Sequence, residues 1–168
     1  MKREMRRIKQ LLPGDKTIEI MEKNTAGVLA LLDDDDYPYA VPVSYVYAEG
    51  EGEGKVYVHS AKEGHKVDAV RNHGKASFCV IDKDQIVQEK YTTYFRSVIV
   101  FGKAHVIEDQ DAKRTALEKL ALKYSPDYKE GIAAEIDGSF KAVRMVQIDI
   151  EHMTGKEAIE LVNAGTAD

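Results

Sequence analysis

The chain has 168 residues, of which 43% are hydrophobic, and a formal net charge of -5 at pH 7. This length suffices for one domain with its own core, and an intramolecular disulfide is impossible because Cys79 is the only cysteine. The negative charge argues against a general nucleic-acid binder. The longest apolar run, residues 26–32, is too short to cross a bilayer, and the basic first residues lack the apolar stretch of a secretory signal. We therefore expect a cytoplasmic protein that binds neither nucleic acid nor membrane.

Strand patterns dominate the chain after residue 25. Six stretches have strand patterns, most of them with apolar and polar residues in alternation, and they predict strands at residues 26–32, 39–47, 55–60, 75–81, 94–107 and 142–150. Such alternation is typical of an antiparallel sheet with one face open to water or to a ligand. An acidic run at 33–36 and a glycine-glutamate run at 49–54 predict the loops between the first three strands. We expect Cys79 to be a buried strand residue rather than a nucleophile.

Four helices are predicted before and between these strands. Asp15 can cap a short helix near the start, and residues 63–72 predict a helix that stops at Gly74. Asp109 can cap a third helix, and a weaker fourth helix is expected at 127–136. Short strands with helices at their edges predict a mainly β protein with added helices, folded as a small barrel and not as a parallel doubly wound sheet.

The chain has no internal repeat, low-complexity linker or break in composition, so we expect a single domain over residues 1–168. Within it we expect a basic N-terminal arm at 1–14, a helical insertion at 109–138 and a C-terminal tail at 157–168. A flexible arm and an arm folded onto a partner subunit both fit the basic segment.

Residues 56–66 have the pattern of an anion site. A short strand ends with His59 and Ser60, a tight turn follows, and Lys66 lies just inside the next helix. The first turn of a helix carries N–H groups without intrahelical partners at the positive end of the helix dipole, so a phosphate would meet donors there. Lys66 would add a full charge and Ser60 a hydroxyl. A plain strand-turn-helix with a solvated lysine is the alternative.

Two further positions suit a flat ligand. Pro42 lies inside a good strand and removes a ladder donor, so it marks an edge strand, a bulge, or a place where a ligand meets the backbone of residues 41–44. Ser97 is a polar residue on an apolar strand face, and its hydroxyl needs a partner from a ligand or from a backbone carbonyl. That face is expected to hold Phe95, Ile99 and Phe101.

Metal and nucleotide motifs fail on spacing. Lys55 stands where a dinucleotide fingerprint that starts at Gly50 needs its last glycine, and Glu157 stands where a P-loop needs a hydroxyl. His59 and His65 are too far apart for one helical face, and no cysteine lies near them, so no zinc site is expected.

Five segments occur in order over nearly the whole chain: Met5-Arg6-Arg7, PYAVPV at 38–43, VYVHSA at 56–61 followed by Gly64 and Lys66, Tyr94 with SVIVFG at 97–102, and IEHMTGK at 150–156. With these segments the chain resembles the nitroimidazole-resistance group within the pyridoxamine 5′-phosphate oxidase-like family. Members of this family are FMN-binding split β-barrels, which are antiparallel barrels of Greek-key type.

The resemblance implies a homodimer with FMN in two equivalent clefts between the subunits. The FMN phosphate is expected near Ser60 and Lys66, and Arg144 and a turn at residues 154–156 are expected to reach the site from the other subunit. The flavin ring is expected against the backbone of the second and third strands. The implied cofactor contacts are Pro42, Val43, Ser44, Val58, His59, Ser60, Ala61, Gly64, Lys66, Ser97 and Val98.

The resemblance also implies an FMN-dependent oxidoreductase that reduces a small electrophile, such as a nitroimidazole or another nitroaromatic compound, with a reduced nicotinamide as donor. His59 is the candidate catalytic residue, because an imidazole can orient the substrate or supply a proton near neutral pH. Vitamin B6 oxidation is not expected, since residues 156–168 contain no arginine or tryptophan. One alternative is a non-catalytic carrier or sensor of flavin or heme, with one of the five histidines as axial ligand. A structural barrel with a decayed cofactor site is the third.

Overall fold

The computed structural model describes residues 4–50 and 52–165. The first three residues of the expected basic arm and the last three of the expected tail therefore lie outside the described part. No helix within the described residues is long and apolar enough to cross a membrane.

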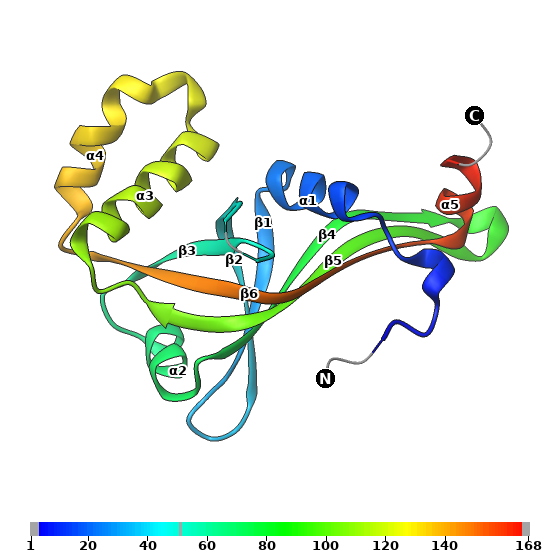
Figure 1. Cartoon of the computed structure of the whole chain (residues 1–168), viewed down its shortest axis with the longest axis horizontal. Helices are drawn as coiled ribbons and strands as arrows, with labels where there is room; N and C mark the ends of the chain where they lie inside the picture. The colour runs from blue at the N-terminus through cyan, green and yellow to red at the C-terminus, as the bar shows by residue number, and fades with distance from the viewer. Residues whose placement is uncertain (1–3, 51, 166–168) are drawn as a thin grey trace.

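Six antiparallel strands form a closed barrel, which confirms the predicted mainly β architecture (Figure 1). Neighbouring strands pair in the order β1–β2–β3–β6–β5–β4 around the barrel. The strands are β1 (Ala26–Leu32), β2 (Pro38–Ala48), β3 (Lys55–Ala61), β4 (Lys75–Val87), β5 (Thr92–Val106) and β6 (Val143–Glu157). The α-helices are α1 (Gly14–Lys23), α2 (His65–His73), α3 (Gln110–Tyr124), α4 (Ile132–Ser139) and α5 (Ile159–Gly165), and the short 3-10 helices are η1 (Ile8–Gln10), η2 (Gln88–Lys90) and η3 (Pro126–Gly131).

β6 is longer than predicted. Residues 154–156, expected to form a turn, continue the strand and pair with β5, with Lys156 opposite Ser97. Gly155 allows α1 to pack directly on this strand, since a Cβ atom there would lie 2.4 Å from the Thr17 hydroxyl oxygen. The far ends of β4, β5 and β6 thus extend beyond the barrel toward α5 (Figure 1).

The helix ends follow local signals, with one exception. Gly74 ends α2 in the left-handed conformation, with φ at 61°, as its place after the helix predicts. Asp109 caps α3, because its carboxylate accepts a hydrogen bond of 2.8 Å from the backbone N–H of Ala112. The expected cap at Asp15 is wrong, since Pro13 precedes α1 and Asp15 lies in the first turn.

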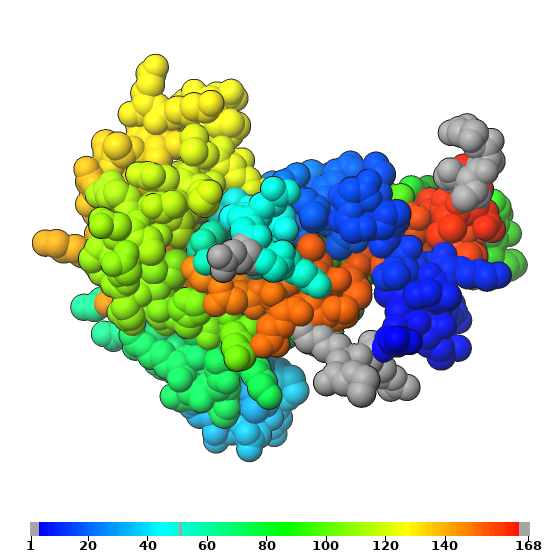
Figure 2. All heavy atoms as spheres, in the orientation of Figure 1, coloured from blue at the N-terminus to red at the C-terminus, as the bar shows by residue number. Residues whose placement is uncertain are grey.

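Two apolar clusters hold the molecule together. The larger fills the barrel, where Tyr45, Phe78 and Leu29 are fully buried. The smaller joins the outer face of β6 to helices α3 and α4, and it consists of Ile107, Ala116, Leu117, Ile136 and Met145. These two helices stand out as a lobe at one end of the barrel (Figure 2).

β5 alternates as predicted, with Val98 and Val100 inside the barrel and Ile99 and Phe101 outside, 41% and 46% exposed. Cys79 lies on the outer face opposite Ile99 and is half-buried, so the expectation of a buried cysteine is wrong. Burial raises the pKa of its thiol, which disfavours the reactive thiolate.

Candidate functional site

Strands β2 and β3 pair for only part of their length. Their ladder runs from Ala48 opposite Lys55 to Tyr45 opposite Val58, and then the strands diverge. The first half of β2 continues on β1 alone, and the end of β3 continues on β6 alone. The two facing edges therefore carry backbone groups that no strand occupies, and we call this gap the β2–β3 split.

Pro42 lies in the β2–β3 split. It faces Val28 of β1 in the ladder, and no strand of the described residues pairs with it on its other side. The missing N–H of a proline is tolerated at such an edge. The prediction that Pro42 marks an edge of pairing is thereby confirmed.

The end of β3 and the start of α2 bring hydroxyl and ammonium groups to the split. Ser60 is 8% exposed, and Gly64 leads into α2 with φ at 135°, a conformation that favours glycine. The Lys66 ammonium lies 3.5 Å from the backbone oxygen of His59, and it forms no ion pair with any carboxylate in the described part of the chain. Burial lowers the pKa of Lys66. The split thus holds a partly buried cation without a counter-ion.

His59 points to the outer side of β3, opposite Met145 of β6. Burial, and then the nearby charge of Lys66, lower the pKa of its imidazole below the ordinary value of 6.5. The ring is therefore neutral near pH 7, with one nitrogen that donates and one that accepts. Among the residues that the structure describes, no side-chain or backbone group forms a hydrogen bond with this imidazole.

A cleft of about 380 Å³ opens above His59, between the barrel and helices α3 and α4. Ser44 of β2 joins His59 on its barrel side. The remaining lining residues are Leu117, Leu120, Ala121, Tyr124, Glu135, Ile136, Ser139 and Val143. We call this hollow the His59 cleft.

The end of α3 is fixed to the barrel at the point where the split begins. The Tyr124 hydroxyl accepts a hydrogen bond of 2.8 Å from the backbone N–H of Tyr45 and donates to the backbone oxygen of Thr25. The Lys123 ammonium lies 4.1 Å from the centre of the Tyr45 ring and 3.4 Å from the backbone oxygen of Met21. Burial lowers the pKa of Lys123 to about 8. These contacts hold the helix over the cleft.

The chain brings most predicted cofactor contacts to the split. Val43 packs against the barrel core and Val58 lies within it, so both offer only backbone to a ligand in the split, while Ala61 is exposed at the end of β3. Ser97 and Val98 lie elsewhere. In the strand ladders His59 is opposite Met145 of β6, whereas Ser97 is opposite Lys156, eleven positions further along the same strand. That spacing corresponds to roughly 35 Å of strand. One chain alone therefore does not unite the predicted site.

Arg144 lies beside the chain's own Ser60, its partner in the β3–β6 ladder, and not at the far end of the sheet. Its Nε atom is buried and has no hydrogen-bond partner within the part of the chain that the structure describes. Nearby Lys113 is only 2% exposed and donates a 2.5 Å hydrogen bond to the backbone oxygen of Phe140. Burial, and then Arg144, lower the pKa of Lys113. This second basic pair could not be predicted from a local pattern, because its members are about thirty residues apart in the chain.

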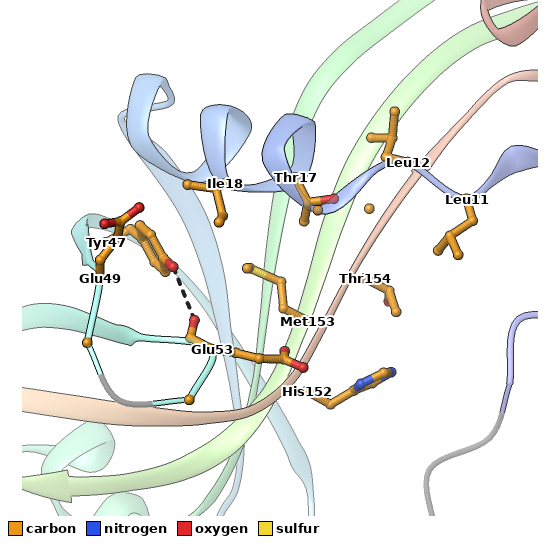
Figure 3. Close-up of a pocket in the computed structure, with 14 residues that line it drawn as sticks. Leu11, Leu12, Thr17, Ile18, Tyr47, Glu49, Glu53, His152, Met153 and Thr154 are labelled. Carbon is orange, nitrogen blue, oxygen red and sulfur yellow. Dashed lines mark hydrogen bonds between the residues drawn. The ribbon is translucent and has the colours of Figure 1, made fainter.

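A separate hollow of about 570 Å³ lies between α1, β6 and the β2–β3 loop (Figure 3). The side chains of Ile18 and Met153 reach toward each other across it, and Glu53 extends toward His152 (Figure 3). The Tyr47 hydroxyl donates a 3.1 Å hydrogen bond to the backbone oxygen of Glu53. No predicted cofactor contact lines this hollow. No group of three or more metal-binding side chains gathers anywhere in residues 4–50 and 52–165.

Comparison with known proteins identifies the fold. The model of a family described as pyridoxamine 5′-phosphate oxidase matches residues 14–157. No curated protein matches the chain.

Several solved structures share this architecture. A candidate 5-nitroimidazole antibiotic resistance protein of Bacteroides thetaiotaomicron has a TM-score of 0.69 and 21% identity, over 88% of this chain and 86% of that one. A flavocytochrome of Azotobacter vinelandii has a TM-score of 0.74 and 19% identity, over 92% and 72% of the two chains. A FAD and heme binding protein of Mycobacterium smegmatis has a TM-score of 0.71 and 21% identity, over 94% and 80%. At these identities the likeness concerns the fold.

Proposed function

We propose that this chain, which belongs to the pyridoxamine 5′-phosphate oxidase family, is an FMN-dependent oxidoreductase that reduces a small electrophile. The observation that carries the proposal is the β2–β3 split, where an unpaired, partly buried lysine and a buried serine lie beside the start of α2. A phosphate there would give Lys66 the counter-ion that it lacks. Backbone groups on the open edges of β2 and β3 would face the flavin ring.

FMN, when bound, supplies two-electron redox chemistry, and the residues of the chain bind it, orient the substrate and manage a proton. Lys66 would hold the phosphate through a charge-assisted hydrogen bond, and the hydroxyl of Ser60 would add a neutral one. His59, neutral near pH 7, would donate a hydrogen bond to an oxygen of the substrate. A nitroimidazole or nitroaromatic substrate and a reduced nicotinamide donor belong to this proposal.

The same proposal includes a homodimer. Ser97 and Val98 lie too far from His59 to share a ligand with it in one chain. Around Ser97 the outer face of β4 and β5 is apolar and open, with Ile81 62% exposed next to it in the ladder. Exposed apolar surface of this kind is typical of an interaction site. A second copy packed on this face would bring its own Ser97 toward the split of the first.

A carrier of heme is the second candidate, and one observation favours it. His59 is a neutral imidazole without a hydrogen-bond partner among the described residues, beside a mostly apolar cleft, and heme iron binds such a ligand. Two proteins of similar fold are described as a flavocytochrome and as a FAD and heme binding protein. A Soret band that disappears in His59→Ala would support the carrier.

Reduction of an acceptor tests the enzyme. The FMN-loaded protein should bleach with a reduced nicotinamide, and addition of a nitroaromatic acceptor should restore the oxidised spectrum. His59→Gln should retain FMN and slow the second step, because the amide can hydrogen-bond but is a poor proton donor. If the bleached protein is reoxidised by the acceptor no faster than free reduced FMN is, the chain is not a reductase of such compounds.

A further inference from the structure

Helices α3 and α4 form one wall of the His59 cleft, and none of the proposed FMN contacts comes from them. Leu117 and Ile136 pack on Met145, which faces outward from β6 next to His59 in the ladder. Helix α3 continues along the cleft with Leu120 and Ala121. Apolar side chains therefore extend from the packed cluster into the open cleft. We call this pair of helices the α3–α4 wall.

The α3–α4 wall is fixed to the barrel at one end, and its two helices are tied to each other at the other. Tyr124 anchors the end of α3 to the backbone of Tyr45 and Thr25. Lys113 joins the start of α3 to the backbone oxygen of Phe140, which directly follows α4. Both contacts are made by groups of the chain itself. A ligand in the cleft would therefore not have to supply the interactions that hold its helical wall.

The lining of the His59 cleft sets what can bind there. Five of its ten lining residues are aliphatic, and the lining contains no lysine or arginine. The Glu135 carboxylate is an exposed negative charge at its edge. The imidazole of His59 and the hydroxyl of Ser44 are the polar groups on the barrel side. Ser139 adds a hydroxyl on the helical side, but that hydroxyl donates to the backbone oxygen of Glu135.

Once a phosphate occupies the split, the charge of Lys66 does not compensate the negative charge of Glu135 at the cleft. Its ammonium lies at the backbone oxygen of His59, on the strand, and not in the lining of the cleft. A bound phosphate would neutralise it. An anionic substrate in the cleft would then meet Glu135 without a compensating cation, whereas an uncharged one would lose little hydration on contact with aliphatic walls.

We propose that the α3–α4 wall selects the substrate, and that the His59 cleft admits small uncharged ring compounds carrying one hydrogen-bond acceptor while it rejects their carboxylate analogues. This inference rests on the proposed function, and it names the substrate class of the same site. The acceptor atom of the ring compound meets the N–H of His59, and its ring lies against Leu120 and Ala121. A cleft of about 380 Å³ has the size of a site for a small molecule.

The test compares two probes of nearly the same shape, 4-nitrobenzyl alcohol and 4-nitrobenzoate, by their binding to the oxidised FMN-loaded protein followed by NMR. The alcohol should bind at least tenfold more tightly than the benzoate. Ala121→Phe fills the cleft and should weaken the alcohol at least tenfold, while Leu120→Ala removes part of the wall and should weaken it about threefold. Leu122→Phe is the matched control, since Leu122 is exposed on the same helix and does not line the cleft. It should bind the alcohol as the wild type does.

FMN affinity, measured on each variant, separates this inference from the function on which it rests. Both Ala121→Phe and Leu120→Ala should retain the FMN affinity of the wild type. Equal binding of the two probes, no binding of the alcohol, or unchanged binding in both wall variants would overturn the inference. Loss of FMN in Ala121→Phe would overturn it too, because the flavin would then occupy the cleft. If the wild type binds no FMN, the proposed function fails, and the same comparison on the flavin-free protein still decides whether the wall selects uncharged rings.

Discussion

Replacement of Lys66 by methionine removes the charge at the β2–β3 split and retains most of the side-chain volume. The ammonium is partly buried and has no acidic partner among the described residues, so its contact with a phosphate replaces no existing ion pair. A hydrogen bond to a charged group contributes about 1.5–3 kcal/mol. FMN should therefore bind about 10- to 150-fold more weakly to Lys66→Met. Fluorescence titration of the flavin-free protein with FMN measures this change.

The same substitution has a second, independent readout. The Lys66 charge helps to lower the pKa of His59, so the imidazole pKa should rise in Lys66→Met toward 6.5. NMR titration of the His59 ring protons follows it. Lys62→Met is the control, because Lys62 is exposed in the loop before α2 and should alter neither quantity. Unchanged FMN affinity together with an unchanged His59 pKa in Lys66→Met would refute the assignment of Lys66 to the phosphate.

Three further predictions concern the framework of the site. Tyr124→Phe leaves the N–H of Tyr45 without its acceptor and should lower the free energy of unfolding by about 1–2 kcal/mol in urea titrations; Tyr128→Phe, at an exposed tyrosine, should not. Gly155→Ala places a Cβ atom 2.4 Å from the Thr17 oxygen and should cost about 1–3 kcal/mol by the same assay, while Gly138→Ala, with nothing within 4 Å, should be neutral or stabilising. Lys123 has a folded pKa of about 8 against 10.5 unfolded, so the unfolded chain binds more protons between these values and stability should rise with pH across them. Solvent contact reduces that gain to about 1–2 kcal/mol, and Lys123→Met should abolish it; equal pH slopes for the two proteins would contradict the burial of Lys123.

Sequence patterns correctly predicted those elements that depend on residues close together in the chain. The apolar run of β1, the alternation along β2, the glycine after α2 and the carboxylate before α3 each act within a few residues, and the structure has them as expected. Residues 154–156 have the composition of a turn, yet pairing with β5 and contact with α1 keep them in a strand. Asp15 could cap a helix, but the chain enters α1 through Pro13.

Part of the candidate site could likewise be predicted from residues close together in the chain, and part of it could not. His59, Ser60, Gly64 and Lys66 are close in sequence, so the segment that holds them could be recognised directly. The cleft above His59 could not be predicted in this way, because the apolar stripe of α3 does not show which strands the helix will cover. The hydrogen bond between Tyr124 and the Tyr45 backbone joins residues 79 positions apart, and no local sequence pattern predicts it.

The most direct test of the central claim is an equilibrium titration of the flavin-free protein with FMN, with an absorption spectrum of the protein as purified. The account predicts flavin bands, saturation at one FMN per chain, and a salt-sensitive affinity that falls about 10- to 150-fold in Lys66→Met. A protein that binds no FMN at micromolar concentration, or that carries only a Soret band, would contradict it.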